Sequence, residues 1–127
     1  MPGADSPLHW INKIESGLPA KSIRNFARRY ALPDNLISEI LVMSRSTLMR
    51  RRKDGRLTES ESDDLVRIAG LYAMAENVLE GKDSAAQWMR EPNRSLGGAA
   101  PIDYARTTIG SREVENLLGR IEHGIAA

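Results

Sequence analysis

The stretch from Thr58 to Gly81 constrains the fold more than any other part of the chain. It opens with the capping box "TESE", in which the side chains of Thr58 and Glu61 satisfy free backbone amides at a helix start. The predicted helix runs to about Leu79 and ends at Gly81. It carries two apolar stripes at helical spacing, one formed by Leu65, Ile68, Ala69, Tyr72, Ala75 and Leu79, the other by Leu71, Met74 and Val78. A helix that is apolar on two sides is buried between layers, so we expect a central helix that joins two halves of the chain.

Shorter helical patterns occupy the rest of the chain, each preceded by a proline or a capping residue. No segment alternates convincingly between apolar and polar residues, so the predicted fold class is all-α. The residues from Glu91 to Pro101 lack a regular period and predict a turn-rich connection. We expect the shorter helices to start at Ser6-Pro7, Pro19, Pro33, Ser44 or Ser46, Asp83, Pro101 and Ser111, and four of them to end at Gly17, Asp54-Gly55, Gly110 and Gly124.

The composition excludes several classes of site. There is no cysteine among the 127 residues, which excludes disulfides, thiolate metal sites and a cysteine nucleophile and fits a reducing cytosol. No apolar run approaches the roughly 20 residues of a membrane span. The N-terminus also lacks the basic-then-apolar layout of a signal peptide. We therefore expect a cytoplasmic protein that does not contact a membrane.

The net charge of +1 conceals a separation of charge along the chain. Residues 1–57 hold 11 Lys and Arg against 5 Asp and Glu, whereas residues 58–127 hold 7 against 12. A chain that separates its charges in this way presents two surfaces to two kinds of partner. The basic half is suited to a polyanion and the acidic half is not.

The basic half contains a segment with the build of a helix-turn-helix, "LISEILVMSRSTLMRRRKDGR". An apolar-striped helix is followed by a short turn and by a second helix that opens with small polar residues. Leu48 is the expected inward anchor of the second helix. The residues expected at its exposed start and outer side, facing base edges, are Arg45, Ser46, Thr47, Arg50 and Arg51. Those further along, expected to face the DNA backbone, are Arg52, Lys53 and Arg56. The candidate DNA-binding residues are Ser44, Arg45, Ser46, Thr47, Arg50, Arg51, Arg52, Lys53 and Arg56.

The alternative is a solvated helix whose cations favour its C-terminal end, which accounts adequately for Arg52 and Lys53. It does not account for six cations between Arg45 and Arg56 with only Asp54 against them. DNA binding is therefore the preferred interpretation of this segment.

Two further segments carry a resemblance to a known family, "TLMRRRKDGRLTESESDDLVRIAGLYAMAENV" and "WMREPNRSLGGAAPIDYARTTIGSREVENLLGRIEHGI". The chain resembles the Xre/MbcA/ParS antitoxins from about Leu18 to its end. The resemblance implies a helix-turn-helix bundle joined by a long central helix to a small helical toxin-binding domain. The implied divisions are an N-terminal extension, residues 1–17, a DNA-binding domain with the central helix, 18–80, and a toxin-binding domain, 81–127.

The resemblance also implies partners. Such antitoxins bind a RES-domain toxin, an NAD-consuming enzyme, cover its active site with their C-terminal region and help the complex bind its own operator DNA. A homodimer or a larger toxin–antitoxin assembly is expected, and the second stripe of the central helix is either a dimer seam or a contact within one chain. Two-fold operators favour dimeric readers.

Some residues of the C-terminal part are better candidates for toxin contact than others. Trp88 fits core filling and direct contact equally well, whereas Tyr104, Val114, Leu117 and Leu118 are expected in the core. The small, uncharged tail could place its terminal carboxylate in a nucleotide pocket lined by arginines, and fraying of that end is the alternative. The candidate toxin-binding residues are Trp88, Arg106, Thr107, Arg112, Arg120, Glu122, Gly124, Ile125, Ala126 and Ala127.

Nothing in the sequence assembles into an active site. His9 and His123 are far apart and lack carboxylates at ligand spacing, and "SLGG" follows no strand and lacks the lysine of a phosphate loop. We expect no catalytic residues, no metal and no cofactor. An antitoxin that also binds operator DNA is the first functional hypothesis. A stand-alone helix-turn-helix transcriptional regulator with a C-terminal dimerisation domain is the second, and an enzyme is the least favoured.

Overall fold

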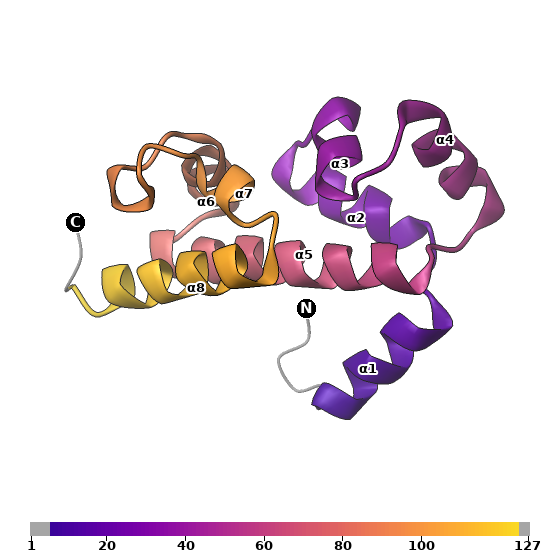
Figure 1. The fold of residues 1–127 in the computed structure, drawn as a ribbon, viewed down its shortest axis with the longest axis horizontal. Coiled ribbons are helices and arrows are strands. Elements are labelled where there is room, and N and C mark those ends of the chain that lie inside the picture. The colour runs from indigo at the N-terminus through magenta and orange to yellow at the C-terminus, as the bar shows by residue number, and fades with distance from the viewer. Residues whose placement is uncertain (1–5, 125–127) are drawn as a thin grey trace. The chain divides into compact units, whose positions relative to one another are not determined.

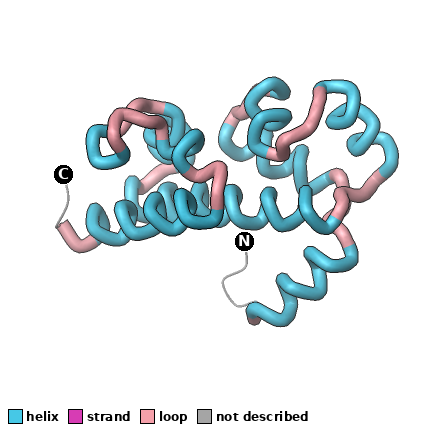
Figure 2. Tube along the Cα trace, in the orientation of Figure 1, coloured by secondary structure: helices cyan, strands magenta, loops and turns pink. Residues whose placement is uncertain are grey.

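The computed structural model describes residues 6–124, and most of these residues are helical. It contains no β-strand, only an isolated bridge between Pro19 and Arg56, so the predicted all-α fold class is confirmed (Figures 1 and 2). No helix within these residues is long and apolar enough to cross a membrane. The elements are α1 (Pro7–Ser16), α2 (Lys21–Tyr30), α3 (Asp34–Ile40), α4 (Arg45–Asp54), α5 (Glu59–Leu79), α6 (Lys82–Arg90), the 3-10 turn η1 (Arg94–Leu96), α7 (Pro101–Tyr104) and α8 (Thr108–Glu122).

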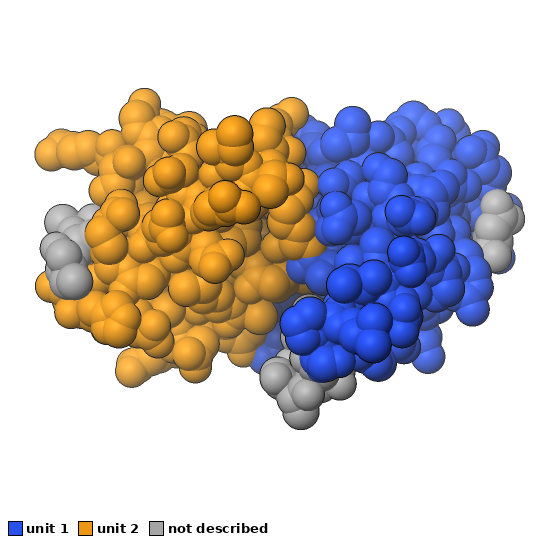
Figure 3. Space-filling view, turned by 60° about the horizontal axis from the view of Figure 1, so that its bottom comes forward, with its two compact units in different colours: residues 1–66 blue, residues 67–127 orange. Residues whose placement is uncertain are grey.

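The chain divides into two compact units, residues 1–66 and 67–127, and the boundary falls inside α5 (Figure 3). The capping box at the start of α5 is confirmed: the Thr58 amide donates to Glu61 Oε1 at 2.9 Å, and the Glu61 amide donates to Thr58 Oγ1 at 3.1 Å. The helix ends at Leu79 as predicted. Most of its first apolar stripe is buried, with Ala69 and Leu79 half-buried, whereas in the second stripe Leu71 is buried and Met74 and Val78 are half-buried.

In the first unit, the segments before α2 and after α4 lie against each other. The Leu57 amide donates to the Leu18 carbonyl at 2.9 Å and the Ala20 amide donates to the Gly55 carbonyl at 2.7 Å. These bonds hold the backbone around Pro19 in an extended form, so α2 begins at Lys21 and not at the proline. The core of the unit consists mainly of Leu18, Ile23, Phe26, Tyr30, Leu36, Ile37, Ile40, Leu41, Leu48, Leu57 and Leu65.

In the second unit, α6, α7 and α8 pack their apolar sides together with the later turns of α5. Arg67 of α5 supplies a polar link inside this unit: its guanidinium donates to the Ala105 carbonyl and, at 2.5 Å, to Ser111 Oγ. The Ser111 hydroxyl in turn donates to the Ala105 carbonyl at 2.9 Å. The core is formed by Ile68, Leu71, Tyr72, Ala75, Ala85, Met89, Leu96, Ile102, Val114, Leu117 and Leu118.

Two predicted helix starts in this unit are wrong. The last helix begins at Thr108, because Thr107 is its cap and accepts a hydrogen bond from the Gly110 amide at 3.0 Å. Ser111 lies buried inside the helix, and Gly110 does not end the preceding one, since α7 stops at Tyr104. The helix after Gly81 begins at Lys82, so Asp83 lies in its first turn and not at its cap.

Candidate functional site

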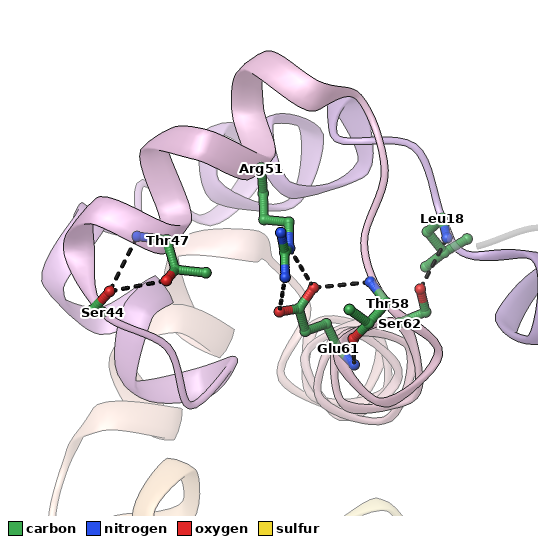
Figure 4. A network of polar contacts seen from close by, with 7 residues as sticks. All are labelled: Leu18, Ser44, Thr47, Arg51, Thr58, Glu61 and Ser62. Carbon is green, nitrogen blue, oxygen red and sulfur yellow. Dashed lines mark hydrogen bonds and ion pairs between the residues drawn. The ribbon is translucent and has the colours of Figure 1, made fainter.

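The helix-turn-helix consists of α3, a turn over residues 41–43, and α4. Ser44 is the cap of α4: its hydroxyl accepts a hydrogen bond from the Thr47 amide at 3.1 Å and donates to Thr47 Oγ1 at 3.0 Å (Figure 4). Gly55, in the left-handed conformation, ends the helix. Leu48 is fully buried, which confirms it as the inward anchor of the second helix.

The predicted DNA-binding residues divide into two groups by exposure. Thr47, Arg51 and Arg52 are half-buried. The outward cations of α4 itself are Arg45, Arg50 and Lys53. No ion pair joins Arg50 or Lys53 to a side chain that the structure describes. The exposed group consists of Ser44, Arg45, Ser46, Arg50, Lys53 and Arg56.

Arg51 does not lie on the outer side of α4, so that part of the sequence prediction is wrong. Its guanidinium turns towards α5, where Nε donates to Glu61 Oε1 at 2.8 Å and Nη2 donates to Glu61 Oε2 at 3.2 Å (Figure 4). The cause is the capping box, which places the Glu61 carboxylate within reach of α4. A bidentate arginine–carboxylate pair of this kind is strong and geometrically specific.

Asp34 holds cations on the other flank of α4. Its carboxylate accepts a hydrogen bond from Arg52 Nη2 at 2.7 Å and lies 3.7 Å from Arg45 Nη2. The hydrogen bond from Arg52 is the main cause that lowers the pKa of Asp34, with smaller contributions from the charges of Arg52 and Arg45 that outweigh the opposing effect of burial. Arg52 therefore serves the contact between α3 and α4.

Arg56, just after the helix, donates to the Gly17 carbonyl at 2.6 Å. Its guanidinium thus helps to join the segment that follows α4 to the segment that precedes α2. Neither charge nor exposure distinguishes Arg56 from Arg50, because both are exposed arginines. The hydrogen bond to the Gly17 carbonyl distinguishes them.

In the second unit, the candidate toxin-binding residues occupy different environments. Trp88 is half-buried, and the exposed members are Arg106, Thr107, Arg112, Arg120, Glu122 and Gly124. Thr107 also serves as the cap of α8, and Arg106 lies 3.5 Å from the Asp103 carboxylate. Ile125, Ala126 and Ala127 lie outside the described residues.

Two exposed apolar side chains in this unit were not among the predicted contact residues. Tyr104, expected in the core, is 39% exposed, and Ile109 is 76% exposed. Val114, Leu117 and Leu118 are fully buried, as expected. The sequence signal for Ile109 is an apolar residue two positions after the Thr107 cap, before the buried residues Val114, Leu117 and Leu118.

The Tyr104 and Ile109 positions lie at the same corner of the fold. A Cβ added to Gly110 would collide with the Tyr104 carbonyl oxygen. The absence of a side chain at residue 110 therefore lets the first turn of α8 approach the end of α7. Gly110 therefore lies close to the Tyr104 backbone, and Ile109 is the residue directly before Gly110.

The described residues contain no group of three or more His, Cys, Asp or Glu that could hold a metal ion. The polar clusters of both units are instead arginines bound to carboxylates or to main-chain carbonyls. Arginines in such clusters either link two helices of the same chain or form charge-assisted hydrogen bonds with carboxylates or phosphates of a partner.

Comparison with known protein families separates the same two parts of the chain. The profile described as "Antitoxin Xre-like helix-turn-helix domain" matches residues 9–70. The profile described as "Antitoxin Xre/MbcA/ParS C-terminal toxin-binding domain" matches residues 74–124. Together they span the helix-turn-helix, α5 and all of the later helices.

Curated relatives agree with these profiles. An Antitoxin Xre of Photorhabdus laumondii is 39% identical over 87 residues, 68% of this chain and 59% of the relative. An Antitoxin Xre of Pseudomonas putida is 30% identical over 121 residues, 95% of this chain and 74% of the relative. A Prs ADP-ribosylating antitoxin of a Sphingobium strain is 25% identical over 132 residues, 96% of this chain and 83% of the relative. The chain spans about three fifths of the length of the Photorhabdus relative. It belongs to the Antitoxin Xre family, with an Xre-like helix-turn-helix domain followed by an Xre/MbcA/ParS C-terminal toxin-binding domain.

Proposed function

We propose that this protein is a non-enzymatic cytoplasmic antitoxin that binds a cognate RES-domain, NAD-consuming toxin, occludes its active site and represses its own operon. The observation that carries the proposal is the pairing of a capped, cationic helix-turn-helix with a toxin-binding domain in one chain. Residues 18–80 would bind DNA and residues 81–127 would bind the toxin. RES specificity rests on the family resemblance of the C-terminal segment.

The corner formed by Tyr104 and Ile109 supports a toxin contact in the second unit. Tyrosine and arginine are enriched among the residues that dominate the binding energy of protein interfaces. Arg106 and Arg112, both exposed, flank this corner in the sequence. We therefore place the toxin-binding surface over the end of α7 and the first turn of α8.

Replacing Ile109 with aspartate tests this surface. An acidic residue in the first turn of a helix interacts favourably with the helix dipole, so Ile109→Asp should leave α8 folded. In co-expression with the neighbouring toxin gene, we expect this variant to lose protection against growth arrest. Thr108→Asp, which puts the same charge on the preceding exposed residue, is the matched control and should keep it. Full protection by Ile109→Asp would remove this corner from the interface.

The tail is proposed to enter the toxin's nucleotide pocket, as residues 124–127 carry no charged side chain. Deleting Ile125-Ala126-Ala127 should leave toxin binding measurable by co-purification and should restore NAD consumption by the bound toxin. Complete inhibition by the shortened chain would exclude the tail from the active site.

On the DNA side, Arg50 is the preferred base-reading residue because it is exposed on the outer side of α4. Arg50→Ala should weaken operator binding by ~1–3 kcal/mol if it makes a base-specific contact. Protection against the toxin should persist, because the substitution lies in the first unit. Loss of both activities together would mean that α4 serves the fold and not DNA recognition.

A dimer is proposed as the DNA-binding form, since two-fold operators favour dimeric readers. The apolar side of α1 supports its role as the seam: Leu8 and Ile11 are exposed, and no residue of α1 is buried. Leu71 in the second stripe of α5 is already buried within one chain. Light scattering of Ile11→Glu should give a monomer where the unaltered chain gives a dimer. A dimer in both cases would point to another seam.

A further inference from the structure

The recognition helix α4 has few apolar contacts to hold it. Leu48 is its one fully buried side chain among those that the structure describes, and most of its other described residues are exposed. A single apolar anchor restrains the position of a ten-residue helix, but it leaves rotation about that anchor weakly restrained. The orientation of α4 must therefore depend on polar contacts at its flanks.

One such contact is bidentate, the pair between Arg51 and Glu61. It links α4 to the first turn of α5 through bonds of 2.8 and 3.2 Å, and the two side chains are only 20% and 14% exposed (Figure 4). The Glu61 carboxylate is itself held in place, because Oε1 also accepts from the Thr58 amide. Two parallel bonds to a fixed carboxylate determine an angle as well as a distance.

The electrostatics of Glu61 agree with this role. Burial opposes its ionisation, but the hydrogen bonds from Arg51 and Thr58 and the charge of Arg51 outweigh burial and lower the pKa of the carboxyl. The pair is therefore fully charged at neutral pH.

We propose that Glu61 is a positioning residue for operator recognition: through Arg51 it orients α4 in the groove, and Arg51 itself contacts neither bases nor phosphates. This inference rests on the proposed operator binding and assigns a positioning role in DNA binding to an acidic residue that follows the basic half of the sequence.

The proposal predicts that removing the negative charge of Glu61 lowers the affinity for promoter DNA, which is the opposite of the usual effect. Removing a negative charge near a DNA-binding surface should strengthen binding if that charge only repels phosphates. If Glu61 orients α4, its neutralisation should instead weaken specific binding. Glutamine serves as well as glutamate in a capping box, so Glu61→Gln removes the charged pair while it keeps the start of α5.

The first experiment measures affinity for the gene's own promoter DNA and for a scrambled duplex by fluorescence anisotropy, with the full-length protein. Glu61→Gln should lower the affinity for promoter DNA about tenfold, the scale of a charged hydrogen-bonded pair. Affinity for the scrambled duplex should stay equal or rise. Glu59→Gln is the matched control, because Glu59 is exposed in the same helical turn, and it should not weaken promoter binding. An equal or higher promoter affinity of Glu61→Gln would overturn the proposal.

A double-variant comparison separates positioning by Arg51 from direct contact by Arg51 and keeps the capping box. If Arg51 acts only through Glu61, the double variant Arg51→Gln with Glu61→Gln should bind promoter DNA no more weakly than Glu61→Gln alone. If Arg51 touches DNA, its replacement should lower the affinity further and make the salt dependence shallower by about 1, and the proposal fails. Thermal unfolding and protection against the toxin report the folding of each variant.

The outcomes also separate this inference from the proposed function. Promoter binding by the unaltered chain, with a further loss of affinity when Arg51→Gln is added to Glu61→Gln, would reject the positioning role alone. Failure of the unaltered chain to prefer its promoter, with protection against the toxin intact, would reject operator binding and the inference with it.

Discussion

At the scale of single residues, the turn of the helix-turn-helix carries backbone strain. Val42 has a φ of 52° and a side chain that is 82% exposed. The left-handed region is unfavourable for L-residues by roughly 1–2 kcal/mol and especially for β-branched ones, whereas glycine adopts it freely. Val42→Gly should therefore raise the free energy of unfolding by about 1 kcal/mol, measured by urea denaturation. Met43→Gly is the control, since the φ of Met43 is not positive, and it should destabilise the fold. Equal destabilisation by both variants would contradict the proposed backbone strain at Val42.

Two glycines of α8 have opposite requirements for space. A Cβ at Gly110 would collide with the Tyr104 carbonyl oxygen, whereas nothing lies within 4 Å of a Cβ at Gly119. Gly110→Ala should lower the free energy of unfolding by about 2 kcal/mol, because backbone must move to accommodate the methyl group. Gly119→Ala should raise it by up to about 1 kcal/mol through helix propensity. Thermal unfolding of the two variants tests the contrast, and equal shifts in the same direction would contradict the close approach of α7 and α8.

At the scale of elements, the carboxylates of Asp34 and Glu61 connect α4 to its neighbours. Both pKa values lie below their ordinary values: that of Asp34 chiefly through the Arg52 hydrogen bond, and that of Glu61 because the Arg51 and Thr58 contacts outweigh burial. As the pH falls, these two carboxyl groups therefore take up protons at a higher pH in the unfolded chain than in the folded chain.

The sign of the pH dependence follows from these two pKa values. The stabilisation by both pairs is complete above about pH 5 and is lost as the pH falls through the ordinary carboxyl range near ~4 and then through the lower folded values. Urea denaturation between pH 6 and pH 3 should show a steeper loss of stability for the unaltered chain than for the Asp34→Asn, Glu61→Gln double variant. Parallel curves would show that these pairs do not contribute.

At the scale of the whole molecule, the charge separation along the sequence should govern salt dependence. If Arg45 and Lys53 each neutralise one phosphate, the logarithm of the DNA-binding constant should fall with the logarithm of salt concentration with a slope of about −2 per chain. Lys53→Ala should make this slope shallower by about 1 per chain. Lys82→Ala, an exposed lysine of the second unit, is the matched control and should leave the slope unchanged. An effect of Lys82 equal to that of Lys53 would mean that DNA contacts are not confined to the first unit.

Sequence by itself determined the all-α class, the extent of α5, the capping box and the helix-turn-helix with its Leu48 anchor. Each of these depends on local signals: a cap residue, a periodic apolar stripe or a glycine after the last turn. The charge count likewise identified a basic first half. It did not distinguish the arginines from one another, because composition carries no information about which guanidinium has a carboxylate within reach.

Tertiary structure alone decided which cations are outward and which glycine of α8 has no room for a side chain. Glu61, ten residues after Arg51, binds this arginine only because α4 and α5 pack together. In the same way, Asp34 accepts a hydrogen bond from Arg52 because α3 and α4 pack together. Gly110 resembles a helix end in the sequence, yet it lies inside α8, and a Cβ there would collide with the Tyr104 carbonyl oxygen. These features depend on contacts between residues from different elements, and such contacts arise only when the helices have packed against each other.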